Sequence, residues 1–267
     1  MEPVEILRDG SVTEIALNRP ERLNAMDVPS LRKLRETLQE VAVDASVRAV
    51  LLTGNGGAFC AGGDVAVMEE NRRKGELPQL FHLLTGEQEM SVRELLTMPK
   101  PVVAALPGVA AGGGLSLALA CDWRIASSKA LLVPAFPKLG AVPDGGLTYF
   151  LPHFVGIGLA QELLFTNARV EAARARELGL VHEVVPPEGL MARARERTRE
   201  LAEGPTFAYS WIKRLMVSAF SEGLETQLAL ERRGAVEAAR GTELPEGIEA
   251  FHQKRASRFR PAQPDRA

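Results

Sequence analysis

The sequence predicts an α/β protein in which a partly parallel sheet is followed by a helical C-terminal region. A strand, helix and strand pattern covers residues 12–52, and a second one covers 102–126. Such βαβ units place consecutive strands side by side in parallel. After Pro186-Pro187 the strand patterns stop and charged helical segments dominate. We therefore expect an α/β core over 1–187 and a helical region over 188–267, packed on the core or on a neighbouring subunit.

Composition and charge are those of an ordinary globular protein. With 267 residues, 46% of them hydrophobic, the chain can bury a sizeable core. The net charge of −2 gives no reason to expect nucleic acid as a partner. Cys60 and Cys121 lie far apart without metal-binding spacing, so we expect small core residues, no metal and a reducing compartment. No secretory signal is visible at the N-terminus, which predicts a cytoplasmic protein.

The first part of the chain reads as a hairpin, a helix and a strand. Apolar runs at 4–7 and 12–17 flank an Asp-Gly pair, which is typical of a hairpin turn. Asp27 is a helix N-cap candidate, and apolar residues recur at helical spacing over 31–41. The next strand, at 47–52, leads into a glycine-rich loop at the strand end where α/β sheets bind ligands. That loop lacks nucleotide-binding spacing.

The stretch between Lys100 and Asp122 contains no charged residue, and we expect it to form the buried centre of the protein. A buried strand at 102–106 is followed by three glycines and a small, leucine-rich helix at 115–120. A helix that begins on bare glycines exposes N–H groups and its positive dipole end, which suits an oxyanion. A backbone N–H near Gly63 can face them as a second donor. Alternatively, the glycines only allow close packing. The glycines also argue against a membrane span.

The remaining elements are mostly helical. A long helix over 77–98 precedes the central strand, and helical patterns resume after residue 145. A short strand is expected at 181–185. The expected helices are 145–154, 158–165, 170–178, 188–202, 205–220, 224–240 and 246–256.

Several motifs in this order resemble the crotonase (enoyl-CoA hydratase/isomerase) superfamily. They are Leu17-Asn18-Arg19-Pro20 with Leu23-Asn24-Ala25, the run 58–64, Lys100-Pro101 with 108–114, Cys121-Asp122, and 246–255. The resemblance implies a crotonase-like spiral of ββα repeats and a helical C-terminal trimerisation region. It also implies homotrimers or dimers of trimers, and an acyl-CoA thioester as substrate without a further cofactor.

The resemblance also assigns site residues. Backbone N–H groups of Gly63 and Gly113 would hold the thioester oxygen in an oxyanion hole. Two late residues, Phe251 and Lys254, are similar to residues that reach CoA, often from a neighbouring subunit. For Arg22 and Lys254 the alternative is an exposed charge without a ligand. The full set implied to line CoA is Arg22, Asn24, Ala25, Ala61, Gly62, Asp64, Phe251 and Lys254.

The two places where hydratases of this superfamily carry glutamates are here Ser116 and Phe136. Neither side chain can act as a carboxylate base, which disfavours water addition by the two-glutamate route. Both are expected at the acyl pocket, although Ser116 can equally be a helix serine bonded to its own backbone.

A carboxylate does occur at Asp144, in a Val-Pro-Asp run that resembles the isomerase branch, nearest the isomerase of ring-epoxidised phenylacetyl-CoA. One aspartate suffices to move a proton along an acyl chain through a thioester enolate, so we expect Asp144 to be catalytic. Apolar surroundings such as Phe136 would raise its pKa toward neutrality. The alternative is that Asp144 caps the helix beginning at Gly145.

Four functions remain open at this stage. An enoyl-CoA isomerase is the first. The others are an enoyl-CoA hydratase (lyase) of fatty-acid or aromatic-acid degradation, and an enzyme with Asp144 as nucleophile, as in the aryl-CoA dehalogenase branch. That branch has a tryptophan where Phe136 stands. The last is a CoA-binding subunit without catalysis.

Overall fold

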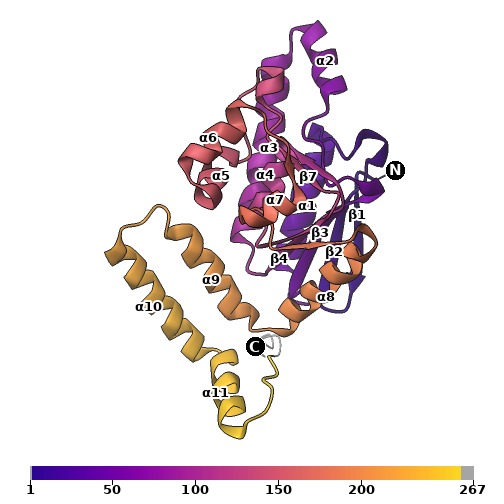
Figure 1. Cartoon of the computed structure of the whole chain (residues 1–267). Helices are drawn as coiled ribbons and strands as arrows, with labels where there is room; N and C mark the ends of the chain where they lie inside the picture. The colour runs from indigo at the N-terminus through magenta and orange to yellow at the C-terminus, as the bar shows by residue number, and fades with distance from the viewer. Residues whose placement is uncertain (1, 260–267) are drawn as a thin grey trace.

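The computed structural model describes residues 2–259 and places a six-stranded sheet at the centre of the chain (Figure 1). Its strand order is β1-β2-β3-β4-β6-β9. The first two strands pair antiparallel as the predicted hairpin, and every later neighbour pairs parallel. The strands span Val4–Asp9 (β1), Val12–Leu17 (β2), Ala49–Gly54 (β3), Val102–Leu106 (β4), Trp123–Ser127 (β6) and Glu183–Val185 (β9). The predicted mixed α/β class is confirmed.

A second, three-stranded sheet has the order β5-β7-β8 and was not predicted. It consists of Val109–Ala111 (β5), Leu131–Val133 (β7) and Val170–Glu171 (β8). The helix predicted over 170–178 is therefore wrong in its first part. Val170 pairs with Leu132 across β7, so the chain is extended there, and helix α7 spans only Ala172–Glu177.

Both faces of the large sheet are covered, because alternate residues of a buried strand point to opposite sides. Val50, Leu52 and Ala104 belong to the main core with the leucines of α1. Leu51 and Val103 face the other way, toward α8. Figure 1 shows α1 and α3 on one side of the strands and α8 on the other. These helices span Val28–Val43 (α1), Leu77–Thr97 (α3) and Leu190–Glu203 (α8).

Helix α1 begins as the sequence predicts. The Asp27 carboxylate accepts a hydrogen bond from the Ser30 backbone N–H, and the Ser30 hydroxyl accepts one from the Asp27 N–H, each at 2.9 Å. Such a reciprocal pair satisfies two otherwise unpaired donors at the helix start. Helix α2 (Val65–Lys74) was not predicted; it is short, charged and has no buried residue, so it carries no apolar stripe.

The helix predicted to be buried is α4 (Gly113–Ala120), and all eight of its residues are buried. Two short helices, α5 (Leu147–Val155) and α6 (Ile157–Phe165), follow in the chain, and α5 packs directly on α4. Four 3₁₀ turns complete the described core: η1 (Pro20–Arg22), η2 (Asn55–Gly57), η3 (Pro137–Leu139) and η4 (Pro187–Gly189).

The last three helices extend away from the sheet (Figure 1). They are α9 (Thr206–Ser218), α10 (Leu224–Arg240) and α11 (Glu243–Gln253). Many of their apolar side chains are exposed, including Ile212, Leu224 and Phe251. By contrast, α8 covers the sheet although it lies in the predicted helical region. The division at 187/188 stays a prediction.

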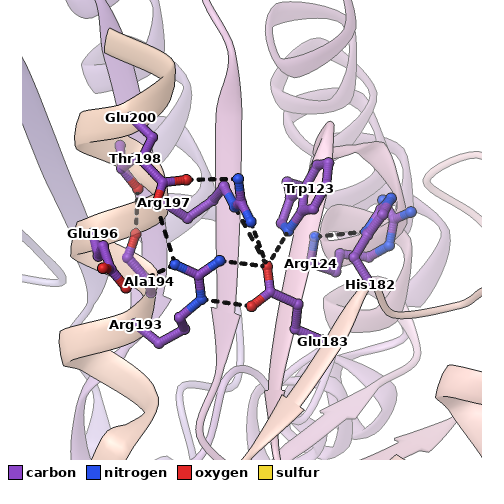
Figure 2. A network of polar contacts seen from close by, with 10 residues as sticks. All are labelled: Trp123, Arg124, His182, Glu183, Arg193, Ala194, Glu196, Arg197, Thr198 and Glu200. Carbon is purple, nitrogen blue, oxygen red and sulfur yellow. Dashed lines mark hydrogen bonds and ion pairs between the residues drawn. The ribbon is translucent and has the colours of Figure 1, made fainter. Parts of the chain in front are cut away.

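A polar network fastens α8 to the edge of the sheet (Figure 2). The Glu183 carboxylate on β9 binds Arg193 at 2.6 Å and Arg197 at 3.2 Å, both from α8. The Trp123 indole donates to the same carboxylate at 3.2 Å. Beside it, the buried Arg124 guanidinium donates to the Cys121 carbonyl at the end of α4. Across residues 2–259, no helix combines the length and apolar character that crossing a membrane requires.

Candidate active site

A cavity of about 520 Å³ lies between the glycine-rich loop, helices α2 and α3, the start of α4 and the segment before α5. Gly63, Gly113 and Asp144, which the sequence analysis singled out, all line it. The remaining wall is largely apolar, with a few charged side chains from α2 and η3. It consists of Ala61, Gly62, Val65, Met68, Glu69, Arg72, Leu77, Phe81, Leu84, Gln88, Gly112, Ala135, Phe136, Lys138, Leu139 and Ala141.

The two glycine turns reach the cavity along parallel segments. Cys60 and Ala110 form a parallel bridge, and the Ala111 N–H donates to the Cys60 carbonyl at 2.9 Å. From this bridge, one segment continues three residues to Gly63 and the other continues three residues to Gly113. This shared register is what places two main-chain turns from distant parts of the sequence side by side.

Backbone hydrogen bonds to Met26, in the segment after η1, hold the Gly63 loop in place. The Met26 N–H donates to the Gly62 carbonyl at 2.7 Å, and the Asp64 N–H donates to the Met26 carbonyl at 2.8 Å. Gly62 has a φ of +94°, and a Cβ there would lie 2.9 Å from the Ala111 carbonyl oxygen. Glycine is therefore required at this turn for both conformation and close approach.

The Gly113 turn is the bare helix start that the sequence predicts. Helix α4 begins at Gly113, and no side chain in the described part of the chain caps its first turn. Gly112 takes a φ of +52° and donates its N–H to the Val133 carbonyl at 3.0 Å. First-turn N–H groups of a helix have no partner within the helix, so those near Gly113 can bind a ligand oxygen.

Asp144 lies partly buried at this cavity, and loss of water around it raises the pKa of its carboxyl from 3.8 to about 6. The nearby Gln88 amide opposes the rise, because an N–H donor favours the ionised carboxylate. Within residues 2–259, the buried Oδ1 atom has no hydrogen-bond partner. A carboxylate with these properties is available as a base near neutral pH.

The alternative role of Asp144 as a helix cap is wrong. Helix α5 begins at Leu147, its N-cap is Gly146, and no side chain of the described residues caps it. Gly145 and Gly146 have φ values of +57° and +81° and reverse the chain between Asp144 and the helix. The carboxylate therefore does not meet the helix N–H groups.

Ser116 and Phe136 differ in how they relate to the cavity. Ser116 is fully buried and is not among the lining residues. Its hydroxyl donates to the Asp144 carbonyl at 2.9 Å, so it supports the Asp144 segment from behind. Phe136 is 8% exposed and lines the cavity.

Two of the residues implied to line CoA, Ala61 and Gly62, lie on the cavity wall. Asn24 instead is buried, and its amide donates to the carbonyls of Asn55 and Ala58 at 2.9 and 2.8 Å. Asp64 accepts from the Ala66 N–H at the start of α2 and binds Arg19 at 2.9 Å. These two polar side chains thus hold the loops that form the cavity.

The other implied CoA residues lie outside the cavity wall. Ala25 is buried next to Asn24, and Arg22 is exposed on η1. Phe251 and Lys254 are exposed at the end of α11, which lies at the opposite end of the molecule from α2 (Figure 1). A single chain does not bring them to the cavity.

Gln88 is a buried polar residue of the cavity wall that was not predicted from the sequence. It is 2% exposed and lies on α3 between the buried Leu84 and Val92. The signal was available, because a polar residue in the apolar stripe of a helix must find partners. Arg72 and Lys138, at the cavity rim, carried no such signal.

A metal site does not appear in the part of the chain that the structure describes: no three His, Cys, Asp or Glu side chains gather there. The two sheets, their covering helices and the cavity between two glycine turns are the arrangement expected of an enzyme of the crotonase class. Residues 8–262 match the model of the Enoyl-CoA hydratase/isomerase family, and the chain belongs to that family. The predictions of the superfamily and of an enzyme are confirmed.

Some relatives of the chain are named isomerases and others are named hydratases. The chain is 40% identical to the 1,2-epoxyphenylacetyl-CoA isomerase of Escherichia coli (strain K12), over 93% of this chain and 94% of that protein. It is 34% identical to the short-chain-enoyl-CoA hydratase of Clostridium acetobutylicum, again over 93% and 94%. A crystal structure of an enoyl-CoA hydratase from Polaromonas sp. JS666 superposes with a TM-score of 0.91, at 34% identity, covering 96% of this chain and 99% of that one. The predicted crotonase-like fold is confirmed.

Proposed function

We propose that the protein is an enoyl-CoA isomerase in which Asp144 moves one proton along the acyl chain of a CoA thioester. The observation that carries the proposal is that Asp144 lines the same cavity as the turns at Gly63 and Gly113. Ser116 and Phe136 occupy the two places where hydratases of the superfamily carry glutamates. Of the carboxylates in the predicted site, Asp64 is bound by Arg19 and the Ala66 N–H, whereas Asp144 lines the cavity and is proposed as the base.

The reaction needs a base and a site for negative charge. Asp144 removes a proton from the carbon next to the thioester carbonyl, and the electron pair moves onto the thioester oxygen. Backbone N–H groups at Gly63 and Gly113 stabilise this enolate, each by about 3 kcal/mol. Asp144 then returns the proton further along the acyl chain, so the double bond moves and no atom is gained or lost. A pKa of about 6 lets the same group accept and release the proton near neutral pH.

Binding of the CoA portion is divided between two kinds of residue in this proposal. Ala61 and Gly62 would contact CoA at the cavity, while Asn24 and Asp64 act by holding the loops. Phe251 and Lys254 would reach the site of a neighbouring subunit, as part of a homotrimer or a dimer of trimers. The thioester itself is the substrate, and the proposed chemistry uses no further cofactor. A cytoplasmic location stays a prediction.

Hydratase activity is the second candidate, and one observation favours it. The Oδ1 atom of Asp144 has no hydrogen-bond partner within the described residues 2–259, so this acceptor can hold a water molecule beside the acyl chain. The similarity to the Clostridium acetobutylicum hydratase agrees with this candidate, as that to the Escherichia coli isomerase agrees with the first.

Two substrates separate the candidates. A 3-enoyl-CoA that becomes conjugated supports the isomerase, and a 2-enoyl-CoA that loses conjugation and takes up water supports the hydratase. The Asp144→Asn variant keeps the size of the side chain but cannot accept a proton. It should bind acyl-CoA normally and lose at least 10³-fold in isomerisation rate. A near-normal rate in this variant would remove Asp144 from the mechanism.

A further inference from the structure

Gln88 is a polar side chain in a place that otherwise selects apolar ones. It lies on α3 with 2% of its surface exposed, and the stripe around it contains Leu84, Val92 and Leu95. Burying an amide without hydrogen bonds costs free energy, so a glutamine persists there only if its amide is bound. Its partners therefore indicate its role.

Those partners are the two halves of the proposed site. Gln88 Nε2 donates to the backbone carbonyl of Gly113 at 3.3 Å. The same Nε2 atom lies against the Asp144 loop, because a Cβ at Gly145 would overlap it, and the nearby amide lowers the pKa of the Asp144 carboxyl. An amide NH₂ group has two N–H donors, so one nitrogen can serve both partners. Gln88 thus connects the turn that offers N–H groups to the residue that offers a base.

Two glycines, Gly113 and Gly145, leave the space that the Gln88 amide occupies. A Cβ at Gly113 would lie 2.5 Å from Gln88 Oε1 and 2.7 Å from Nε2. A Cβ at Gly145, directly after Asp144, would overlap Gln88 Nε2 and lie 2.8 Å from the Ser116 Cβ. Both positions are glycine, so the segments from α3, α4 and the Asp144 loop fit together around one side chain.

We propose that Gln88 is a positioning residue, whose amide fixes the Asp144 carboxylate relative to the Gly113 turn. The proposal rests on the isomerase function stated above and adds a residue that acts through Asp144. A donated N–H favours the ionised carboxylate and orients it, so Gln88 limits how far burial can disfavour the base form. Gln88 also sets the distance between Asp144, which moves the proton, and the Gly113 turn, which binds the thioester oxygen.

Charged groups near the cavity do not replace this contact. Glu69 and Arg72 come from α2, and Lys138 comes from η3. The Glu69 carboxylate is bound by Arg72 at 2.6 Å and by Arg73 at 2.8 Å. The polar groups from α3 and α4 nearest the Asp144 segment are Gln88 and Ser116, and neither titrates. A change in the titration of Asp144 upon substitution of Gln88 therefore reports on the amide contact.

The test is a titration of Asp144 in the protein without substrate. Infrared difference spectra between the wild type and Asp144→Asn give the pH midpoint of this carboxyl. In Gln88→Met, which is similar in size but has no donor, the midpoint should rise by about one pH unit. Steady-state kinetics at pH 7 should show kcat reduced about tenfold or more and KM changed less than twofold, because Gln88 does not hold CoA.

A matched control comes from the same helix. Ser91→Ala removes a buried hydroxyl on α3 that donates to the Glu87 carbonyl at 2.9 Å, and it should leave the Asp144 midpoint and kcat unchanged. If Gln88→Met does not fold, the contact is tested in the wild-type protein instead. Isotope-labelled glutamine side chains are followed by NMR, and the Gln88 NH₂ signals should move with the Asp144 titration.

The outcomes are distinct. An unchanged midpoint in folded Gln88→Met, or Gln88 signals that ignore the Asp144 titration, overturns the role of Gln88. A midpoint equally shifted in Ser91→Ala also overturns it, because the effect is then one of general stability. A shifted midpoint in a protein that isomerises no enoyl-CoA supports the contact between Gln88 and Asp144 and rejects the isomerase function.

Discussion

The hydroxyl of Ser116 donates a hydrogen bond of 2.9 Å to the backbone carbonyl of Asp144. Ser116 is buried in α4, at the place where related hydratases carry a glutamate. The Ser116 side chain does not line the cavity, and its hydroxyl supports the loop that carries the Asp144 carboxylate. A side chain of α4 thus helps to hold the segment whose carboxylate lines the cavity.

Replacement of Ser116 by alanine should impair catalysis more than folding. Loss of a buried hydrogen bond costs about 1–2 kcal/mol of unfolding free energy, and a looser Asp144 segment should lower kcat about tenfold. Urea unfolding and steady-state kinetics measure the two effects. Ser91→Ala, which loses a comparable hydrogen bond on α3, should match the stability loss with kcat unchanged. Equal losses of kcat in both variants would contradict a specific link to Asp144.

The pH dependence of the reaction should follow the ionisation of Asp144. A base acts as its carboxylate, and burial raises the pKa of this carboxyl to about 6. In the free enzyme, kcat/KM should therefore rise tenfold per pH unit below about pH 6 and level off above it. A rate that falls as pH increases through this window would mean that the protonated acid is the active form.

The same carboxyl should make the folded protein less stable as pH rises. Its pKa is about 6 when folded against an ordinary value of 3.8, so folding favours the protonated form. The corresponding stability is fully present below about pH 3.8 and is lost as pH rises through about 6. Asp144→Asn does not titrate, so relative to the wild type it should gain up to about 3 kcal/mol between pH 3 and pH 8. Chemical unfolding at the two pH values checks this, and a gain independent of pH would contradict it.

Much of the fold was predictable, because long elements carry their own signals. The β1–β2 hairpin, the capping box at Asp27 and the buried run of α4 are all local patterns. The strands β5 and β7 are three residues long, so their pairing is decided by partners distant in sequence rather than by periodicity. The charged helix α2 was not predicted because it lies beside the cavity, has no buried residue and therefore shows no apolar stripe in the sequence.

The site divides in the same way. Gly63 and Gly113 were predicted from their glycine-rich turns, and Asp144 from the resemblance of its Val-Pro-Asp run to the isomerase branch; the fold brings all three to one cavity. The resemblance implies that Asn24 and Asp64 line CoA, and the structure adds that their side chains form hydrogen bonds to neighbouring backbone groups. Whether Phe251 reaches a site depends on the assembly of several chains, which no local pattern encodes.

The two glycine turns should respond differently to alanine. At Gly113 the added methyl would meet the buried Gln88 amide at 2.5 Å, so kcat should fall about a hundredfold as the turn or the amide moves. At Gly63 the methyl would meet the flexible end of Met68, which can move aside, so the loss should be about tenfold or less. Kinetics of Gly113→Ala and Gly63→Ala, with circular dichroism to verify folding, compare them. The reverse order would contradict the tight packing around Gln88.

The attachment of α9 to the core should depend on one ion pair. Lys213 Nζ lies 2.8 Å from Asp122 Oδ2, with 8% of the lysine side chain exposed, and the same Oδ2 atom accepts from the Val102 N–H at 2.8 Å. Lys213→Met removes the partner of a partly buried carboxylate, which should cost about 2–3 kcal/mol. Amide hydrogen exchange should accelerate along α9, while the chemistry at the cavity, at the other end of α4, changes little. Arg214→Met is the matched control, because the neighbouring Arg214 is exposed and stacks on Trp211 of the same helix. Equal exchange in both variants would show that apolar packing, rather than the ion pair, holds α9 to the core.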